Sequence, residues 1–118
     1  MATRKSRIAT MPRAKHSPIE GRKFDIGKSQ YGLIPPFAQE EFVKVLTYGA
    51  QKYAPDNWKF VPEAERRYFD ALQRHLWAFK RGERNDSESN LHHLAHAMCC
   101  LAFLLEFSLG TAKPKSTK

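Results

Sequence analysis

Residues 91–108 read LHHLAHAMCCLAFLLEFS, a segment rich in apolar residues at helical spacing. A repeat of three and four residues places one apolar face along a helix. That face comprises Leu91, Leu94, Ala95, Met98, Leu101, Ala102 and Leu105. Beyond Ala97 the segment is apolar on nearly every side, and a helix with this pattern is surrounded on several sides. The pattern predicts a helix over about 90–108 and favours its burial between the subunits of a homo-oligomer.

Two earlier segments have the same periodicity. In the first, over about 37–52, the apolar stripe is formed by Phe42, Val45, Leu46, Gly49, Ala50 and Tyr53. In the second, over about 63–81 with Pro62 at its first position, the stripe is formed by Tyr68, Ala71, Leu72, Leu76 and Phe79, with His75 among them. Pro55 and Gly82 separate the helices, and no segment alternates as a strand does. The sequence therefore predicts an all-α bundle of three main helices.

The net charge of +8 comes from the two ends of the chain. Residues 1–16 contain five basic residues and no acid, and 111–118 contain three more basic residues, whereas 17–110 are balanced with 12 of each sign. We therefore expect one domain over 20–110, Gly- and Pro-rich before its first helix, between a flexible basic arm (1–19) and a basic tail. Nucleic acid would bind only weakly and non-specifically, through these ends.

Other features of the composition narrow the class of protein. No apolar run approaches the ~18 residues of a membrane span, and no apolar segment follows the basic start as in a secretory signal. The adjacent Cys99 and Cys100 do not form a disulfide framework, so we expect reduced, buried thiols. These features favour a cytoplasmic protein that contacts no membrane.

Three carboxylates directly precede three imidazoles in the sequence. They are Glu83, Asp86 and Glu88, followed by His92, His93 and His96. Because residues three or four apart share a helical face, these side chains could meet around a divalent cation. Carboxylates suit Mg²⁺ and Mn²⁺, and imidazoles shift the preference toward Mn²⁺, Fe²⁺ or Zn²⁺. The alternative is helix capping by the acids and core packing by the histidines. The run HHLAH is not the zinc-protease motif, because His93 replaces its essential Glu.

Three further groups of residues could bind a nucleotide. Lys23 and Lys28 flank a glycine in KFDIGK, where N–H and ammonium groups can approach phosphate, although a solvated surface loop is the alternative. Asn57 and Trp58 could read and stack a base together with nearby tyrosines, and the alternative is packing of a loop on a helix. Those tyrosines are Tyr31, Tyr48 and Tyr53. A polar stripe could clamp phosphate if it faces the acidic loop, and is otherwise a solvated face. It consists of Arg67, Asp70 and Arg74.

Several multi-residue motifs occur in one order, namely KFDxGK, LIPP, VLTYGAxKY, NW, RYxDAxxRHL, GExxDxE and HLAHA. Over about 21–107 the chain resembles the small phage-borne proteins labelled dATP/dGTP diphosphohydrolase, often called MazG-like. The resemblance implies an intracellular, all-α, metal-dependent enzyme that hydrolyses deoxynucleoside triphosphates to monophosphate and pyrophosphate. Two departures stand out. Asn90 stands at a position where Gly is expected. All-α pyrophosphohydrolases have two helical carboxylate pairs, and only one such pair, Glu83-x-x-Asp86, is present here.

The motifs and the resemblance together assign a candidate site. The catalytic carboxylates are Glu83, Asp86 and Glu88, which would share a Mg²⁺ or Mn²⁺ ion with His93 and His96. The substrate-binding residues are Lys23, Asp25, Lys28, Asn57, Trp58, Arg67, Asp70, Arg74 and His75. A metal-activated water would attack the α-phosphorus of a purine deoxynucleotide, and the reaction would serve nucleotide-pool control. Two other classes stay open: a protein that binds a nucleotide without turnover, and a nucleic-acid-binding protein that acts through its basic ends.

Overall fold

The computed structural model describes residues 20–110, which fall into two units that divide between residues 30 and 31. The first unit contributes 20–30 and the second 31–110. This division lies inside the single domain expected over 20–110. The basic arm and tail expected at 1–19 and 111–118 lie outside the described residues.

The described part of the first unit is exposed and contains one turn. The amide of Lys28 donates a hydrogen bond to the carbonyl of Asp25 at 3.0 Å. Gly27 has φ +83° in this turn, a left-handed conformation that glycine adopts without steric cost.

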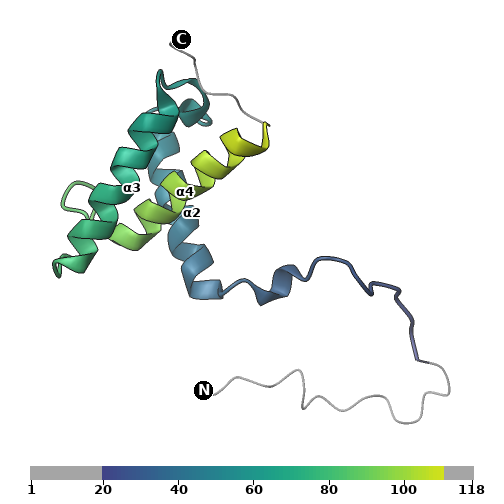
Figure 1. Ribbon diagram of the computed structural model, residues 1–118. Coiled ribbons are helices and arrows are strands. Elements are labelled where there is room, and N and C mark those ends of the chain that lie inside the picture. The colour runs from purple at the N-terminus through teal and green to yellow at the C-terminus, as the bar shows by residue number, and fades with distance from the viewer. Residues whose placement is uncertain (1–19, 111–118) are drawn as a thin grey trace. The chain divides into compact units, whose positions relative to one another are not determined.

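The second unit is helical (Figure 1). Its elements are η1 (Tyr31–Leu33), α2 (Pro36–Lys52), η2 (Asn57–Phe60), α3 (Ala64–Lys80) and α4 (His93–Leu109). Within the described residues there is no strand, although Asn85 and His92 form an isolated antiparallel bridge. The predicted all-α fold with three main helices is therefore confirmed.

Two helix starts differ from those predicted. Helix α3 begins at Ala64, after Glu63 with φ +56°, so Pro62 precedes the helix instead of opening it. Helix α4 begins at His93 and not near residue 90, because Asn90 has φ +61°, which a right-handed helix cannot accommodate. The His92 side chain then caps α4, where its Nδ1 accepts a hydrogen bond from the amide of Leu94 at 3.0 Å.

Helix α4 forms the centre of the core, because it packs against both α2 and α3 (Figure 1). Val45 of α2 is buried against Ala95 and Cys99, and Phe42 and Leu46 pack beside it, which confirms this part of the apolar stripe predicted for the first helix. Tyr53, the last residue of that stripe, follows the helix and is 63% exposed. Closer to the end of α4, the core continues around Trp58, whose ring stacks on Phe103 with centroids 4.4 Å apart. Both ends of the core thus rest on α4.

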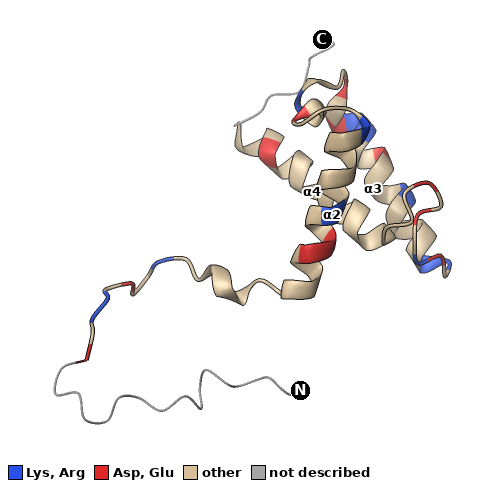
Figure 2. Ribbon diagram, turned by 180° about the vertical axis from the view of Figure 1, so that it is seen from behind, with Lys and Arg blue, Asp and Glu red and all other residues tan. Residues whose placement is uncertain are grey.

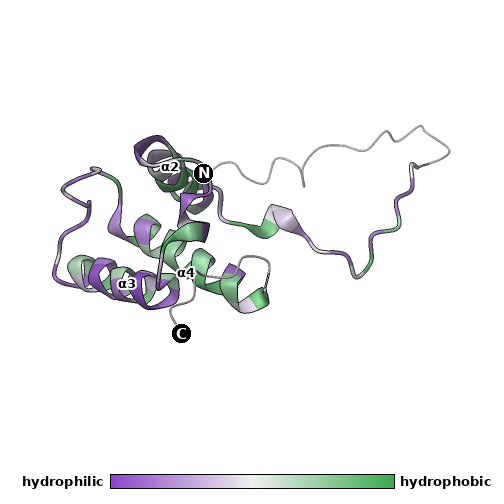
Figure 3. Cartoon of the chain, turned by 90° about the horizontal axis from the view of Figure 1, so that it is seen from above, coloured by the Kyte–Doolittle hydropathy of each residue, from purple (hydrophilic) through white to green (hydrophobic). Residues whose placement is uncertain are grey.

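The opposite side of α4 is apolar and open. Met98, Leu101 and Leu105 are 38%, 56% and 57% exposed, so in a single chain this side of the helix is not surrounded. Part of it lines a groove of about 630 Å³ whose other large apolar members are Phe37, Leu72, Leu76 and Leu94. Figure 3 shows the apolar character along most of α4, and Figure 2 shows that the helix is nearly free of charged residues. None of the helices that the structure describes is both long and apolar enough to cross a membrane.

Candidate active site

The connection between α3 and α4 folds back on the helix that follows it. After α3 the chain reverses at Gly82, which has φ +105°. The amide of His93 then donates to the carbonyl of Arg84 at 2.8 Å, next to the bridge between Asn85 and His92. This pairing places Glu83 beside the first turn of α4.

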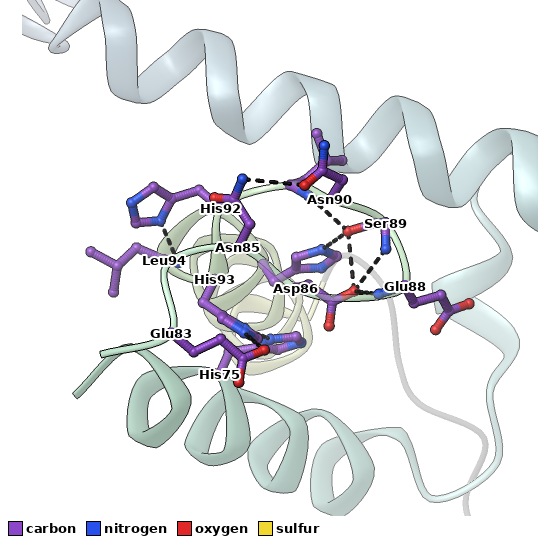
Figure 4. A network of polar contacts seen from close by, with 12 residues as sticks. His75, Glu83, Asn85, Asp86, Glu88, Ser89, Asn90, His92, His93 and Leu94 are labelled. Atoms are coloured by element: carbon purple, nitrogen blue, oxygen red, sulfur yellow. Dashed lines mark hydrogen bonds and ion pairs between the residues drawn. The ribbon is translucent and has the colours of Figure 1, made fainter. Parts of the chain in front are cut away.

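Asp86 organises the same connection with its side chain. Its Oδ2 accepts hydrogen bonds from the amides of Glu88 (3.1 Å) and Ser89 (2.9 Å) and from the Ser89 hydroxyl (3.2 Å) (Figure 4). Such bonds are how an Asp side chain shapes a turn. Burial raises the pKa of Asp86, but the hydrogen bonds from Ser89 outweigh it, so this pKa lies below its ordinary value. Asp86 is therefore a carboxylate at neutral pH.

Two imidazoles from different helices meet beside this carboxylate. Nδ1 of His75 on α3 lies 2.8 Å from Nδ1 of His93 on α4, and His93 is buried with 5% exposure. One ligand atom from each of His75, Asp86 and His93 lies within 4.8 Å of the other two. The sequence predicts His93 and Asp86 in one metal site, whereas His75 was expected among the substrate-binding residues.

Glu83 fixes the orientation of His93. Its Oε2 lies 3.0 Å from Nε2 of His93, on the far side of the ring from His75 (Figure 4). A neutral imidazole that donates from Nε2 has its lone pair on Nδ1, the atom that faces His75 and Asp86. A carboxylate in this position is the usual outer partner of a metal-binding histidine.

His96 completes the polar cluster. Its ring stacks on His75 with centroids 4.6 Å apart and an angle of 10° between the planes, and its Nε2 lies 2.7 Å from the Ser89 hydroxyl. Burial, together with the neighbouring His96 and His93, lowers the pKa of His75 to about 4. Burial likewise lowers the pKa of His96 below its ordinary value. Both rings are therefore neutral at pH 7, and a neutral imidazole has one ring nitrogen that carries a lone pair.

The cluster borders a cavity of about 250 Å³. Along one face of α4, this cavity is lined in turn by His96, Cys99 and Phe103, a span of about 10 Å at 1.5 Å per residue. Asp86 and His75 line it beside His96. Four further aromatic residues line it with Asn57, namely Trp58, Tyr68, Tyr48 and Tyr53. The rest of the lining is aliphatic or glycine, apart from Lys52 and Glu88 at the rim. The cavity thus has a polar end and an aromatic end.

The rim of the cavity carries an ion pair. The Lys52 ammonium on α2 donates to the Glu88 carboxylate, which also accepts a hydrogen bond from the Tyr48 hydroxyl at 3.3 Å. Lys52 lies over the rings of Tyr48 and Tyr53, 5.9 and 5.1 Å from their centroids. Its hydrogen bond lowers the pKa of the Glu88 carboxyl. Glu88 therefore contacts α2 and not the group formed by His75, Asp86 and His93.

The structure brings only some of the predicted site residues together. Those at or beside the cavity are Glu83, Asp86, Glu88, His93, His96, His75, Asn57 and Trp58. Three residues of the α3 stripe are exposed and do not line it: Arg67, Asp70 and Arg74. Arg67 donates to the Pro62 carbonyl at 3.3 Å, and Asp70 pairs with Arg66 at 3.7 Å. The remaining three belong to the first unit, where they are exposed: Lys23, Asp25 and Lys28.

Sequence reasoning missed two contributors to the site, Lys52 and Ser89. Lys52 is four residues from the predicted Tyr48 on the first helix, a spacing that could have shown a shared face. Ser89 stands in the connection between α3 and α4. No local signal pointed to their meeting, because α2 and the connection lie about 36 residues apart in the sequence.

Fold and site together define a small all-α protein with an imidazole–carboxylate cluster at one end of an aromatic cavity. The chain belongs to the family described as dATP/dGTP diphosphohydrolase, N-terminal, whose sequence model matches residues 18–115. A relative from Salmonella phage PMBT28, named dATP/dGTP diphosphohydrolase, is 40% identical over 98 residues. The match covers 83% of this chain and 32% of the relative, so the chain spans about a third of that protein's length. No solved structure is significantly similar to this chain.

Proposed function

We propose that the chain hydrolyses deoxynucleoside triphosphates to monophosphate and pyrophosphate with a divalent cation, in nucleotide-pool control in the cytoplasm of a phage-infected host. The observation that carries the proposal is the shared cavity: His75 and Asp86 line the same 250 Å³ space as Trp58 and Tyr68. A nucleotide has the matching division into an anionic end and an aromatic end. The family and the name of the phage relative support the substrate class and the preference for dATP and dGTP.

The residues at the polar end fit a divalent cation. The imidazoles of His75 and His93 and the carboxylate of Asp86 offer ligand atoms within 4.8 Å of one another, and Glu83 holds the outer nitrogen of the His93 ring. Imidazole ligands favour Mn²⁺ over Mg²⁺ among the two cations predicted from the sequence. The chemistry supplied by such a cation is neutralisation of phosphate charge and a bound water of lowered pKa.

The roles of the chain's own residues follow from their positions. His75, Asp86 and His93 would hold the cation, with His96 stacked on His75 and Glu83 orienting His93. The rings of Trp58 and Tyr68 would contact the base, and the Asn57 amide can hydrogen-bond a base edge. Phosphate contacts by Lys23, Lys28, Arg67 and Arg74, and the place of Asp25 and Asp70 in substrate binding, stay predictions from the sequence.

The test is a product analysis with each of the four dNTPs in Mn²⁺ or in Mg²⁺. We expect monophosphate and pyrophosphate from dATP and dGTP, and a His75→Gln variant that loses turnover. His92→Asn is the matched control, because His92 caps α4 and does not line the cavity, and Asn is an equally good N-cap residue. Turnover without any metal requirement, other products, or a fully active His75→Gln variant would overturn the proposal. Binding without product would identify a nucleotide-binding protein.

The homo-oligomer also stays a prediction. The apolar side of α4 that carries Met98, Leu101 and Leu105 is the surface that supports it, since these side chains are 38% to 57% exposed. Light scattering at micromolar concentration is expected to give a mass of at least twice 13.6 kDa. A stable monomer would contradict it.

A further inference from the structure

Lys52 has a position that the function described above does not use. Among the described residues that line the 250 Å³ cavity, it is the sole Lys or Arg. It stands in the last turn of α2, within the VLTYGAQKY motif of residues 45–53. The four cations assigned to phosphate from the sequence are not part of this lining.

The surroundings of Lys52 direct its charge toward the polar end of the cavity. Its ammonium pairs with Glu88, and the amide of Glu88 donates to Asp86 Oδ2 at 3.1 Å. Glu88, which pairs with Lys52, and Asp86, the carboxylate of the cluster, are separated by a single residue of the connection. The rings of Tyr48 and Tyr53 lie beneath the ammonium and restrict its side chain.

The partner of Lys52 is a replaceable anion. The side chains of Lys52 and Glu88 are 37% and 62% exposed, and an ion pair so open to solvent contributes little to stability. Glu88 is also a poor neighbour for a triphosphate, since like charges at the same rim repel. A phosphate group that reaches Lys52 would replace the Glu88 carboxylate and remove this repulsion.

We propose that Lys52 binds the polyphosphate of the nucleotide, and that Glu88 occupies its place on Lys52 until substrate arrives. The inference rests on the proposed function for the identity of the ligand. It makes Lys52 a substrate-binding residue, and it makes Glu88 a competitor of substrate. If the ion pair only ties the connection to α2, removing either partner would instead have the same effect.

The experiment measures the dissociation constants of inorganic tripolyphosphate and of α,β-methylene dATP in Mn²⁺ by calorimetry. Lys52→Gln is expected to weaken both about 10- to 100-fold, the effect of losing a hydrogen bond to a charged group. Lys52→Arg is expected to retain most of the affinity, and Glu88→Gln to increase it about two- to fivefold. Lys44→Gln is the matched control, because Lys44 is also ion-paired on α2, with Glu41 at 3.0 Å, and does not line the cavity.

Each outcome bears on one proposal or both. The role of Lys52 would be overturned if Lys52→Gln bound tripolyphosphate as tightly as the wild type. It would also be overturned if Glu88→Gln weakened binding as Lys52→Gln does. Should Lys52→Gln unfold, Glu88→Gln still tests the idea, because it leaves Lys52 in place and must shift affinity the other way. A wild-type chain that binds both probes but hydrolyses no dNTP refutes the hydrolase alone. A chain that binds neither probe refutes both.

Discussion

Replacing Glu83 with Gln separates a metal site from a network of ordinary hydrogen bonds. The Gln side chain has the same size and can still accept from His93 Nε2, whose bond to Glu83 measures 3.0 Å. The Glu83 side chain is 50% exposed, so loss of its charge is expected to change the stability of the metal-free chain by less than about 1 kcal/mol. The effect on metal binding is expected to be much larger, because the negative charge makes His93 a stronger ligand.

The size of the effect follows from the linkage between binding and folding. At a free Mn²⁺ concentration about 100 times the dissociation constant, the wild type gains about 2.7 kcal/mol. Loss of an outer carboxylate lowers metal affinity about 10- to 100-fold, which reduces that gain to about 1.4 to 0.4 kcal/mol. For a domain of this size each kcal/mol corresponds to about 4–8 °C in melting temperature. The rise caused by Mn²⁺ should therefore shrink by half or more.

The assay is thermal unfolding of the wild type and Glu83→Gln over a titration of Mn²⁺. Glu41→Gln serves as the control, because Glu41 is also ion-paired and lies on α2 outside the polar cluster. We expect the control to retain the full metal-induced rise. If Glu83→Gln shows the same rise as the wild type, Glu83 does not support a metal ligand and the assignment of His93 as a ligand fails.

Three further predictions concern stability and reactivity. Burial lowers the pKa of His75 to about 4, so the unfolded chain binds the proton of this imidazole more tightly than the folded chain does. The contribution of neutral His75 to the free energy of unfolding is therefore complete above about pH 6.5 and is lost as pH falls toward 4, by up to about 2 kcal/mol between pH 7 and 5. Urea unfolding measures this, and pH-independent stability would count against it. Asn90→Ala should cost about 1 kcal/mol, since Asn90 has φ +61°, whereas Asn90→Gly should melt near the wild type. Burial raises the pKa of Cys99 to about 12 and that of Cys100 to about 11, so both thiols should react with iodoacetamide at pH 8 only after unfolding, and rapid labelling of the native chain would disprove this.

The three helices could be predicted because their apolar residues recur at a period that only a helix satisfies. The start of α4 could not be predicted, because the apolar periodicity continues through residues 90–92. The boundary is set instead by the left-handed conformation of Asn90 and by the cap at His92. Asn is one of the few residues that adopts a positive φ readily, but its presence does not require it. The division between residues 30 and 31 likewise left no compositional signal.

The candidate site was predictable where it is local in sequence. Asp86, His93 and Glu83 lie within one connection and the turn that follows it, so spacing alone could group them. His75 and Lys52 come from α3 and α2, and their place depends on how three helices pack, which spacing does not reveal. Periodicity also placed Arg67 and Arg74 on one stripe of α3 without showing that this stripe faces solvent.

Helix α4 has the polar cluster on one side and an open apolar surface on the other. His93 and His96 therefore share a single rigid element with Leu94, Met98 and Leu101. Suppose that a molecule binds the apolar surface more tightly when the cluster is occupied by its ligand. Thermodynamic reciprocity then requires that this molecule raises the affinity of the cluster for its ligand by the same factor. If copies of the chain associate through this surface with different affinity when the cluster is occupied, protein concentration becomes a variable in every measurement of affinity at the cluster.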